Sequence, residues 1–223
     1  MKSRPAPSPD ASTAKNVVEL EDYAKSKRKT HRRSGEIIDA AARVFAELGY
    51  HGATTQDIAD VLGIRQASLY YYFPSKEVAL EMVCARGVEG FVEAAISVTE
   101  TPGPAADKIA GLIASHLSPL RDRGDYMQVF LNERRHLPAE SRRRIGRHSR
   151  AIEKIFEDVL RAGVEGGEFR PDIDVRLTAL AILGMANAVA AWYGKEKQQP
   201  IDRIADMFAS IVLDGIRKKS RRR

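Results

Sequence analysis

Residues 65–72 gather side chains that could bind the groups exposed by double-stranded DNA. Arginine pairs with guanine, glutamine pairs with adenine, and hydroxyl groups can donate to phosphate oxygens. These residue types occur at Arg65, Gln66, Ser68 and at three consecutive tyrosines, Tyr70, Tyr71 and Tyr72. Successive residues of a helix point about 100° apart, so the three tyrosines cannot all be buried. At least one of them must face solvent or a partner.

Residues for catalysis or metal binding are missing from the sequence. It contains no glycine-rich phosphate loop, no His-Glu-x-x-His pair and no nucleophile elbow. The five histidines do not recur at metal-ligand spacing. The single cysteine, Cys84, excludes an internal disulfide and a cysteine-based zinc site. We therefore expect no enzyme, no metal site and no cofactor.

The elements around the candidate DNA contacts have the pattern of a helix-turn-helix. Apolar spacing predicts a short helix after Thr54–Thr55 and a second over about residues 66–73. Ala59 is small where the second helix would cross the first, and Gly63 tolerates the positive φ of a tight turn. The apolar residues that would fill the angle are Ile58, Leu62, Ile64 and Leu69. The same spacing also suits a helical corner with no role in DNA binding.

The wider sequence resembles the DNA-binding domain of the tetracycline-repressor (TetR) family of regulators. The resemblance is carried by residues 54–59 (Thr-Thr-Gln-Asp-Ile-Ala), by 63–64 (Gly-Ile) and by 69–77 (Leu-Tyr-Tyr-Tyr-Phe-x-x-Lys-Glu). It is specific over about residues 34–80, and Tyr72 departs from it because histidine is frequent there. The resemblance implies a dimeric regulator that binds a palindromic DNA operator, with repression as the family default.

The resemblance also implies a role for each candidate residue. Positions that contact the DNA backbone correspond to Thr54, Thr55, Tyr71, Tyr72 and Lys76. Positions nearest to base edges in the major groove correspond to Arg65, Gln66, Ser68 and Tyr70.

The net charge of +6 is distributed unevenly. Residues 1–34 hold nine basic and four acidic side chains, whereas residues 35–76 hold three basic and five acidic ones. Neutralisation of phosphates by basic side chains supplies most non-specific affinity for DNA. Residues 35–76 carry too few basic side chains for this, so further basic residues must contribute. We predict that the basic run 25–33, which includes Arg32 and Arg33, follows the DNA backbone or enters the minor groove. The alternative is a solvated tail.

Helical periodicity continues to the end of the chain and predicts an all-α fold. We expect an N-terminal three-helix helix-turn-helix domain and a C-terminal bundle of long helices for ligand binding and dimerisation. The helices expected after the first three cover about residues 76–99, 105–122, 126–136, 139–165, 173–194 and 201–217. The expected domains are a disordered basic arm (1–33), the DNA-binding domain (34–80), the ligand-binding and dimerisation domain (81–216) and a basic tail of unassigned role (217–223). With no signal peptide or membrane span, we expect a cytoplasmic protein and no membrane partner.

The last two expected helices could pair with those of a second copy. Leu177–Tyr193 is rich in small residues, and residues 201–217 carry a broad apolar face. Two such helices from each chain can form a four-helix interface. Packing within one chain would leave the same pattern, but the resemblance favours a homodimer.

The resemblance further implies a small-molecule pocket, enclosed mainly by the helices of residues 80–165. The candidate lining residues are Phe91, His116, Leu117, Tyr126, Met127, Phe130, Phe156, Met185 and Trp192. Taken singly, each of them is more typical of ordinary core. The segments 132–138 and 167–172 resemble family members that sense acyl-CoA thioesters. We hypothesise an acyl-CoA effector whose phosphates lie near Arg143, Arg147 or Arg150, because guanidinium groups suit phosphate. The alternative is a ligand-blind DNA-binding or nucleoid-type protein.

Overall fold

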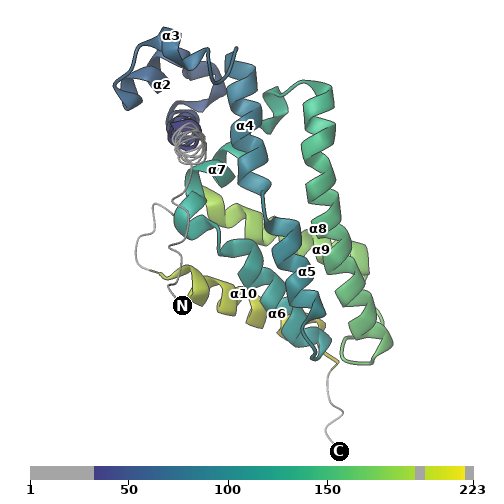
Figure 1. Cartoon of the computed structure of the whole chain (residues 1–223). Coiled ribbons are helices and arrows are strands. Elements are labelled where there is room, and N and C mark those ends of the chain that lie inside the picture. The colour runs from purple at the N-terminus through teal and green to yellow at the C-terminus, as the bar shows by residue number, and fades with distance from the viewer. Residues whose placement is uncertain (1–32, 194–198, 219–223) are drawn as a thin grey trace, which may run out of the picture.

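The computed structural model describes residues 33–193 and 199–218. The described chain is helical, and its only β-structure is an isolated bridge between Phe169 and Arg217. This confirms the predicted all-α fold. The first helices form a head at one end of the molecule, and the later helices form a body beneath it (Figure 1). None of the described helices is long and apolar enough to cross a membrane.

The head comprises residues 33–73 and the body comprises the helices that follow. Residues 33–52 are helical. The other helices are α2 (Thr55–Leu62), α3 (Gln66–Leu69), α4 (Lys76–Val88), α5 (Phe91–Glu100), α6 (Ala105–Leu117), α7 (Leu120–Glu133), α8 (Ala139–Glu165), α9 (Val175–Ala188) and α10 (Ile201–Ile216), with 3₁₀ turns η1 (Arg134–His136) and η2 (Val189–Ala191). In the body, α6 packs against α5, α8, α9 and α10, while α4 packs against α7 and α8.

The head has the helix-turn-helix geometry that the sequence predicts. Thr54 and Asp57 form a reciprocal capping box at the start of α2. Gly63 ends α2 with φ 62° and ψ 35°, a left-handed conformation that glycine adopts without steric cost. Ala59 is fully buried and lets α3 pack closely against α2, which also buries Ile58.

Two of the predicted divisions between helices are wrong. The expected helix over residues 76–99 is divided into α4 and α5, because Gly90 takes φ 83° and starts a new helix. The expected break at Gly124 is also misplaced. The chain breaks earlier, after Leu117, and Pro119 then precedes the first turn of α7, as its fixed φ favours. Gly124 lies inside α7, next to Arg123, whose φ of −128° and ψ of 31° kink the helix.

The far end of the body depends on one close approach between α8 and the following loop. Gly163 faces the fully buried ring of Phe169, and a Cβ on Gly163 would lie 2.2 Å from a ring carbon. The carboxylate of Glu168, the residue before Phe169, accepts hydrogen bonds from the backbone N–H groups of Ala105 and Ala106. Glu168 thereby caps the start of α6, which has no capping side chain of its own.

Candidate functional site

The outer surface of the head carries most of the predicted DNA contacts. Arg65, Ser68 and Tyr70 are exposed, and Tyr71 has 81% of its surface accessible. Tyr72 is half-buried and packs edge-on against Tyr71, with ring centroids 5.1 Å apart. The exposed side chains project from α3 and the turn after it, so they are available to a partner.

The predicted phosphate contacts at the start of α2 are held in a local network. The Thr54 hydroxyl donates to Asp57 Oδ2 at 2.7 Å and accepts from the Asp57 backbone N–H at 3.2 Å. Hydrogen bonds from Thr54 hold the pKa of Asp57 below its ordinary value of 3.8. Gln66 Nε2 donates to Thr55 Oγ1 at 2.6 Å, which joins α3 to α2. Gln66 is therefore half-buried against α2, in contrast to the exposed Arg65 and Ser68.

Lys76 has an intramolecular role that the sequence did not indicate. Its ammonium group donates to the carbonyl oxygens of Tyr50 and Ala53, each at 2.8 Å. It also lies 4.6 Å from the centroid of the Tyr50 ring. The Tyr50 hydroxyl donates to Glu77 at 2.9 Å. Lys76 thus ties the start of α4 to the end of the first helix of the head.

The basic run before the first helix falls mostly outside the described residues. Arg32 lies there, as do all residues before it. Arg33 is described, and it pairs with Glu36 one helical turn away at 3.2 Å.

The head rests on α7 through three polar contacts. Tyr126 donates to Asp39 at 2.5 Å, and Gln128 donates to the Ala46 carbonyl oxygen at 2.9 Å. Glu133 accepts from the Tyr50 backbone N–H at 3.1 Å. Burial and the neighbouring Asp39 carboxylate raise the pKa of the Tyr126 phenol, so it stays protonated as a donor. Any shift of α7 would therefore be transmitted to the head.

A pair of histidines completes this junction. His51 Nε2 and His136 Nδ1 lie 3.2 Å apart, and the Tyr50 ring stacks on His136 with centroids 5.4 Å apart. His51 belongs to the head and His136 to η1, so the pair joins the head to the segment that follows α7. Because the two residues lie 85 positions apart, nothing in the sequence pattern links them.

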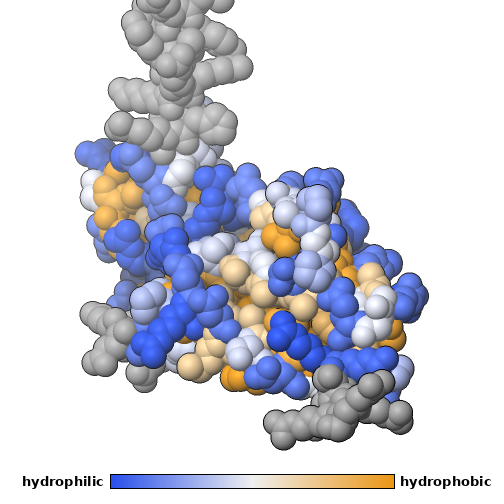
Figure 2. Space-filling model, turned by 90° about the horizontal axis from the view of Figure 1, so that it is seen from below, coloured by the Kyte–Doolittle hydropathy of each residue, from blue (hydrophilic) through white to orange (hydrophobic). Residues whose placement is uncertain are grey.

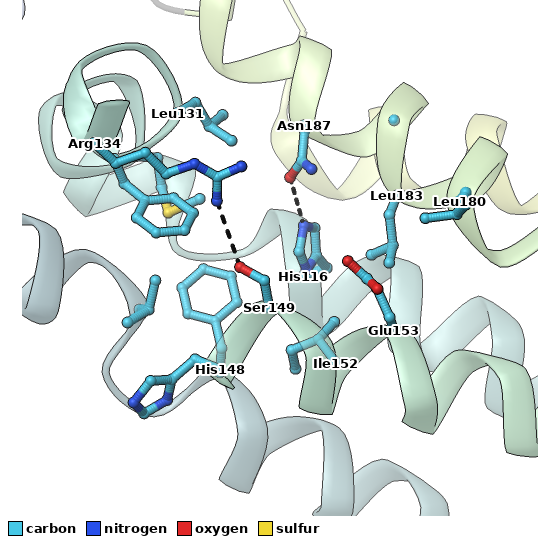
Figure 3. Close-up of a pocket in the computed structure, with 15 residues that line it drawn as sticks. His116, Leu131, Arg134, His148, Ser149, Ile152, Glu153, Leu180, Leu183 and Asn187 are labelled. Carbon is cyan, nitrogen blue, oxygen red and sulfur yellow. Dashed lines mark hydrogen bonds between the residues drawn. The ribbon is translucent and has the colours of Figure 1, made fainter. Parts of the chain in front are cut away.

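A cavity of about 260 Å³ lies in the body and is lined in part by α7 (Figure 3). Helices α4 to α9 all contribute to it. The lining residues are Val88, Phe91, His116, Met127, Phe130, Leu131, Arg134, His148, Ser149, Ile152, Glu153, Leu180, Leu183, Gly184 and Asn187. Met127 and Phe130 are buried and belong to the same helix as Gln128 and Glu133, which hold the head. One helix therefore contacts both the cavity and the head.

Polar side chains divide the cavity into two ends. At one end, Arg134 donates to Ser149 at 3.5 Å and lies 4.8 Å from the Phe130 ring centroid. Towards the other, His116 Nε2 and Asn187 Oδ1 lie 3.0 Å apart (Figure 3). Burial lowers the pKa of His116 from its ordinary value of 6.5, so the ring is neutral at neutral pH.

The cavity includes four of the predicted ligand contacts and omits the others. Phe91, His116, Met127 and Phe130 line it, and Leu117 and Phe156 are buried core residues that do not. Tyr126 instead binds Asp39, Met185 lines a separate groove between α9 and α10, and Trp192 is a half-buried residue after η2. Arg143, Arg147 and Arg150 are exposed on α8 and do not line the cavity.

Five polar lining residues were not predicted from the sequence: Arg134, His148, Ser149, Glu153 and Asn187. Helical spacing places Ser149, Ile152 and Glu153 on one face of α8. This spacing is a sequence signal that could have identified Ser149 and Glu153 as neighbours in the lining. No group of three or more metal-binding side chains occurs among the residues of the described ranges.

Helices α9 and α10 expose apolar side chains. Leu177 on α9 is 63% exposed, and Met207 and Ile211 on α10 are 55% and 57% exposed. A groove of about 530 Å³ runs between the two helices. Seen from below in Figure 2, the surface of the body shows apolar patches between hydrophilic ones. Exposed apolar side chains on adjacent elements are typical of a protein–protein interface.

Two family descriptions match the chain: residues 37–81 match "Bacterial regulatory proteins, tetR family", and residues 102–216 match "Tetracyclin repressor-like, C-terminal domain". The HTH-type transcriptional repressor KstR2 of Rhodococcus jostii RHA1 is 29% identical over 189 residues, which cover 84% of this chain and 92% of the relative.

Solved structures of similar proteins share the whole fold. The ketosteroid transcriptional regulator KstR2 of Mycobacterium tuberculosis has a TM-score of 0.78 and 27% identity, covering 84% of this chain and 96% of its own. FadR of Bacillus subtilis in complex with stearoyl-CoA has a TM-score of 0.65 and 27% identity, covering 81% of this chain and 98% of its own.

Proposed function

Because the chain belongs to the TetR family of bacterial regulatory proteins, we propose that it is a ligand-responsive transcriptional repressor. It binds a palindromic operator as a homodimer, and an acyl-CoA thioester releases it. One observation carries this proposal: α7 contacts an apolar cavity through Met127 and Phe130, and it holds the DNA-reading head through Gln128 and Glu133. An effector in the cavity is thereby placed to reposition the head.

The exposed side chains of the head read the operator. Arg65, Ser68 and Tyr70 are directed at base edges, together with Gln66, whose bond to Thr55 opens when DNA binds. Backbone contacts come from Thr54, Thr55, Tyr71 and Tyr72, supported by the N-terminal arm that ends in Arg32 and Arg33.

Deleting residues 1–33 tests the contribution of the arm. The run of lysines and arginines in it neutralises phosphates, so its loss must flatten the plot of log affinity against log salt by about one unit per lost phosphate contact. The measurement is operator binding by fluorescence anisotropy at several salt concentrations. An unchanged slope would exclude the arm from the DNA interface.

The homodimer forms through α9 and α10. Its support is the exposed apolar surface of Leu177, Met207 and Ile211 on these helices. The two heads of such a dimer meet half-sites about one helical turn of DNA apart, or a multiple of it. The twofold symmetry of the protein then explains why its operator would be palindromic.

The effector enters with its acyl group among the apolar lining residues and its CoA phosphates beside Arg134. The B. subtilis relative in complex with stearoyl-CoA supports this ligand class. Arg134 takes the place that the sequence analysis gave to Arg143, Arg147 or Arg150, because only Arg134 of these four lines the cavity. The other three arginines, exposed on α8, remain available to the distal phosphate of CoA.

Thermal-shift screening of CoA thioesters against the corresponding free acids tests the effector class. A ligand that binds only the folded chain at 100 times its Kd stabilises it by about 2.7 kcal/mol. Arg134→Ala must weaken CoA thioester binding by about tenfold or more. The matched control is Arg161→Ala, because Arg161 is an arginine of α8 that is exposed like Arg134 but lies outside the cavity. A shift with another ligand class, and none with CoA thioesters, contradicts the proposed effector.

We assign the protein no catalytic activity, since its relatives are transcriptional regulators and its residues show no catalytic motif. Because a regulator must reach its operator, we propose that the protein acts in the cytoplasm.

A further inference from the structure

The cavity contains a carboxylate that a saturated acyl chain would leave without a partner. Glu153 lines the cavity from α8 and is half-buried. Among the described residues it has no hydrogen-bond or ion-pair partner. In Figure 3 its carboxylate is directed into the cavity, on the side of His116 and Leu183. Covering this group with methylene groups would remove its water without replacing the lost hydrogen bonds, which is costly.

His116 and Asn187 determine which other polar atoms are free. The Asn187 side-chain oxygen can only accept, so the His116 ring donates to it through Nε2. The neutral ring then keeps Nδ1 as an acceptor. The Asn187 amide nitrogen donates to no acceptor within the described part of the chain.

The cavity therefore offers an acceptor at Glu153 and a donor at Asn187, which the His116 ring holds in place. A hydroxyl group both donates and accepts, so it matches the carboxylate of Glu153 and the amide nitrogen of Asn187, which line the same cavity. A ketone only accepts, so it could use Asn187 but would leave Glu153 unpaired. A free carboxylate would meet the like charge of Glu153 and be disfavoured.

The opposite end of the cavity prefers an anionic group, which the Glu153 end disfavours. Arg134 lies there beside Ser149 and is suited to an anionic group (Figure 3).

The space of about 260 Å³ is just below the range of about 300–1,000 Å³ that is typical of ligand pockets. It suits a compact acyl group better than a long chain.

We propose that the effector is a hydroxyacyl thioester, with its hydroxyl group bound by Glu153 and Asn187 and its CoA portion leaving the cavity past Arg134. This inference rests on the proposed function and specifies the acyl group that the site selects. Glu153 and Asn187 are then specificity-determining residues, because the saturated analogue leaves the carboxylate and the amide nitrogen unpaired, and His116 holds Asn187 in place.

Isothermal titration of the full chain with matched thioesters tests the inference. The probes are hexanoyl-CoA and its derivatives with a hydroxyl group at successive carbons, together with 3-oxohexanoyl-CoA. At least one hydroxylated thioester is expected to bind about tenfold to hundredfold more tightly than hexanoyl-CoA. It must also bind more tightly than the 3-oxo compound.

Two variants assign that preference to the proposed residues. Asn187→Leu and Glu153→Leu must each reduce the preference at least about tenfold, because each removes a partner of the hydroxyl group. Glu165→Gln is the matched control, an exposed glutamate of α8 outside the cavity, and must keep it. Circular dichroism checks that each variant is folded.

Three outcomes overturn the inference. If hexanoyl-CoA binds as tightly as every hydroxylated thioester, the hydroxyl subsite is refuted while the acyl-CoA effector stands. If the preference survives in both leucine variants, these residues do not form the subsite. If no CoA thioester binds at all, the proposed effector fails as well.

Discussion

Replacing Lys76 with methionine separates two roles that its side chain could have. The family resemblance assigns it to the DNA backbone, whereas the structure shows its ammonium group bound to two carbonyl oxygens. Methionine keeps the apolar stem and removes the charge. The structural role predicts a less stable protein with an unchanged salt dependence of DNA binding.

The contacts of Lys76 set the size of the effect. Each of its two 2.8 Å hydrogen bonds involves a charged donor and contributes about 1.5–3 kcal/mol. The cation above the Tyr50 ring adds about 0.5–1 kcal/mol. Lys76 is half-exposed and water replaces part of these interactions, so we expect a loss of about 2–4 kcal/mol. For a chain of this length the midpoint of thermal unfolding should fall by about 4–16 °C.

Two assays measure the outcome: thermal unfolding by circular dichroism, and operator affinity at several salt concentrations. Arg65→Met is the control, because Arg65 is exposed and its loss should change stability by no more than about 0.5 kcal/mol while weakening operator binding. The reasoning is refuted if Lys76→Met unfolds at the wild-type temperature and its salt slope falls by about one unit, as expected for a lost phosphate contact.

Three further predictions concern the body. Gly163→Ala should destabilise the protein by about 1–3 kcal/mol in denaturant titration, because the new methyl group would lie 2.2 Å from a buried aromatic carbon; wild-type stability would refute this close packing. The lowered pKa of His116 means that the unfolded chain takes up a proton more readily than the folded one, so the folded state should lose stability as the pH falls below about 6.5. His116→Gln should reduce this loss and His148→Gln, at an exposed position, should not; equal pH profiles for both variants would contradict the assignment. Met207→Asp should raise the dimer dissociation constant at least about tenfold in analytical ultracentrifugation. Ile96→Asp, at a 41% exposed position on α5, should leave that constant unchanged. A dissociation constant raised by both variants or by neither would exclude the α9–α10 interface.

Local patterns in the sequence predicted the head well because its geometry depends on neighbouring residues. Ala59 and Gly63 determine the turn, and both have the predicted environment. The long helix α8 was also predicted, at residues 139–165, because proline precedes it and glycine follows it. The same rules failed at Gly90, where one left-handed glycine divides a continuous apolar pattern.

The candidate site was harder to predict because it depends on contacts between distant residues. Asn187 lies 71 positions from His116, and Glu133 lies 83 positions from Tyr50. Lys76 shows the same limit within the motif that resembles the family, since the residue type suits DNA while its hydrogen bonds are internal. Composition and periodicity identify the faces of a helix but not which faces of different helices meet. The polar lining of the cavity could therefore be identified only from the structure.

The most direct test of the account is an anisotropy titration of the dimer on its operator with CoA thioesters. The operator can be selected from genomic DNA fragments by the purified protein. We predict a saturable, specific complex that dissociates as a CoA thioester is added, while the corresponding free acid leaves it intact. A specific complex that every CoA thioester leaves unchanged would contradict the account, because it would separate the cavity from the head that α7 is proposed to couple.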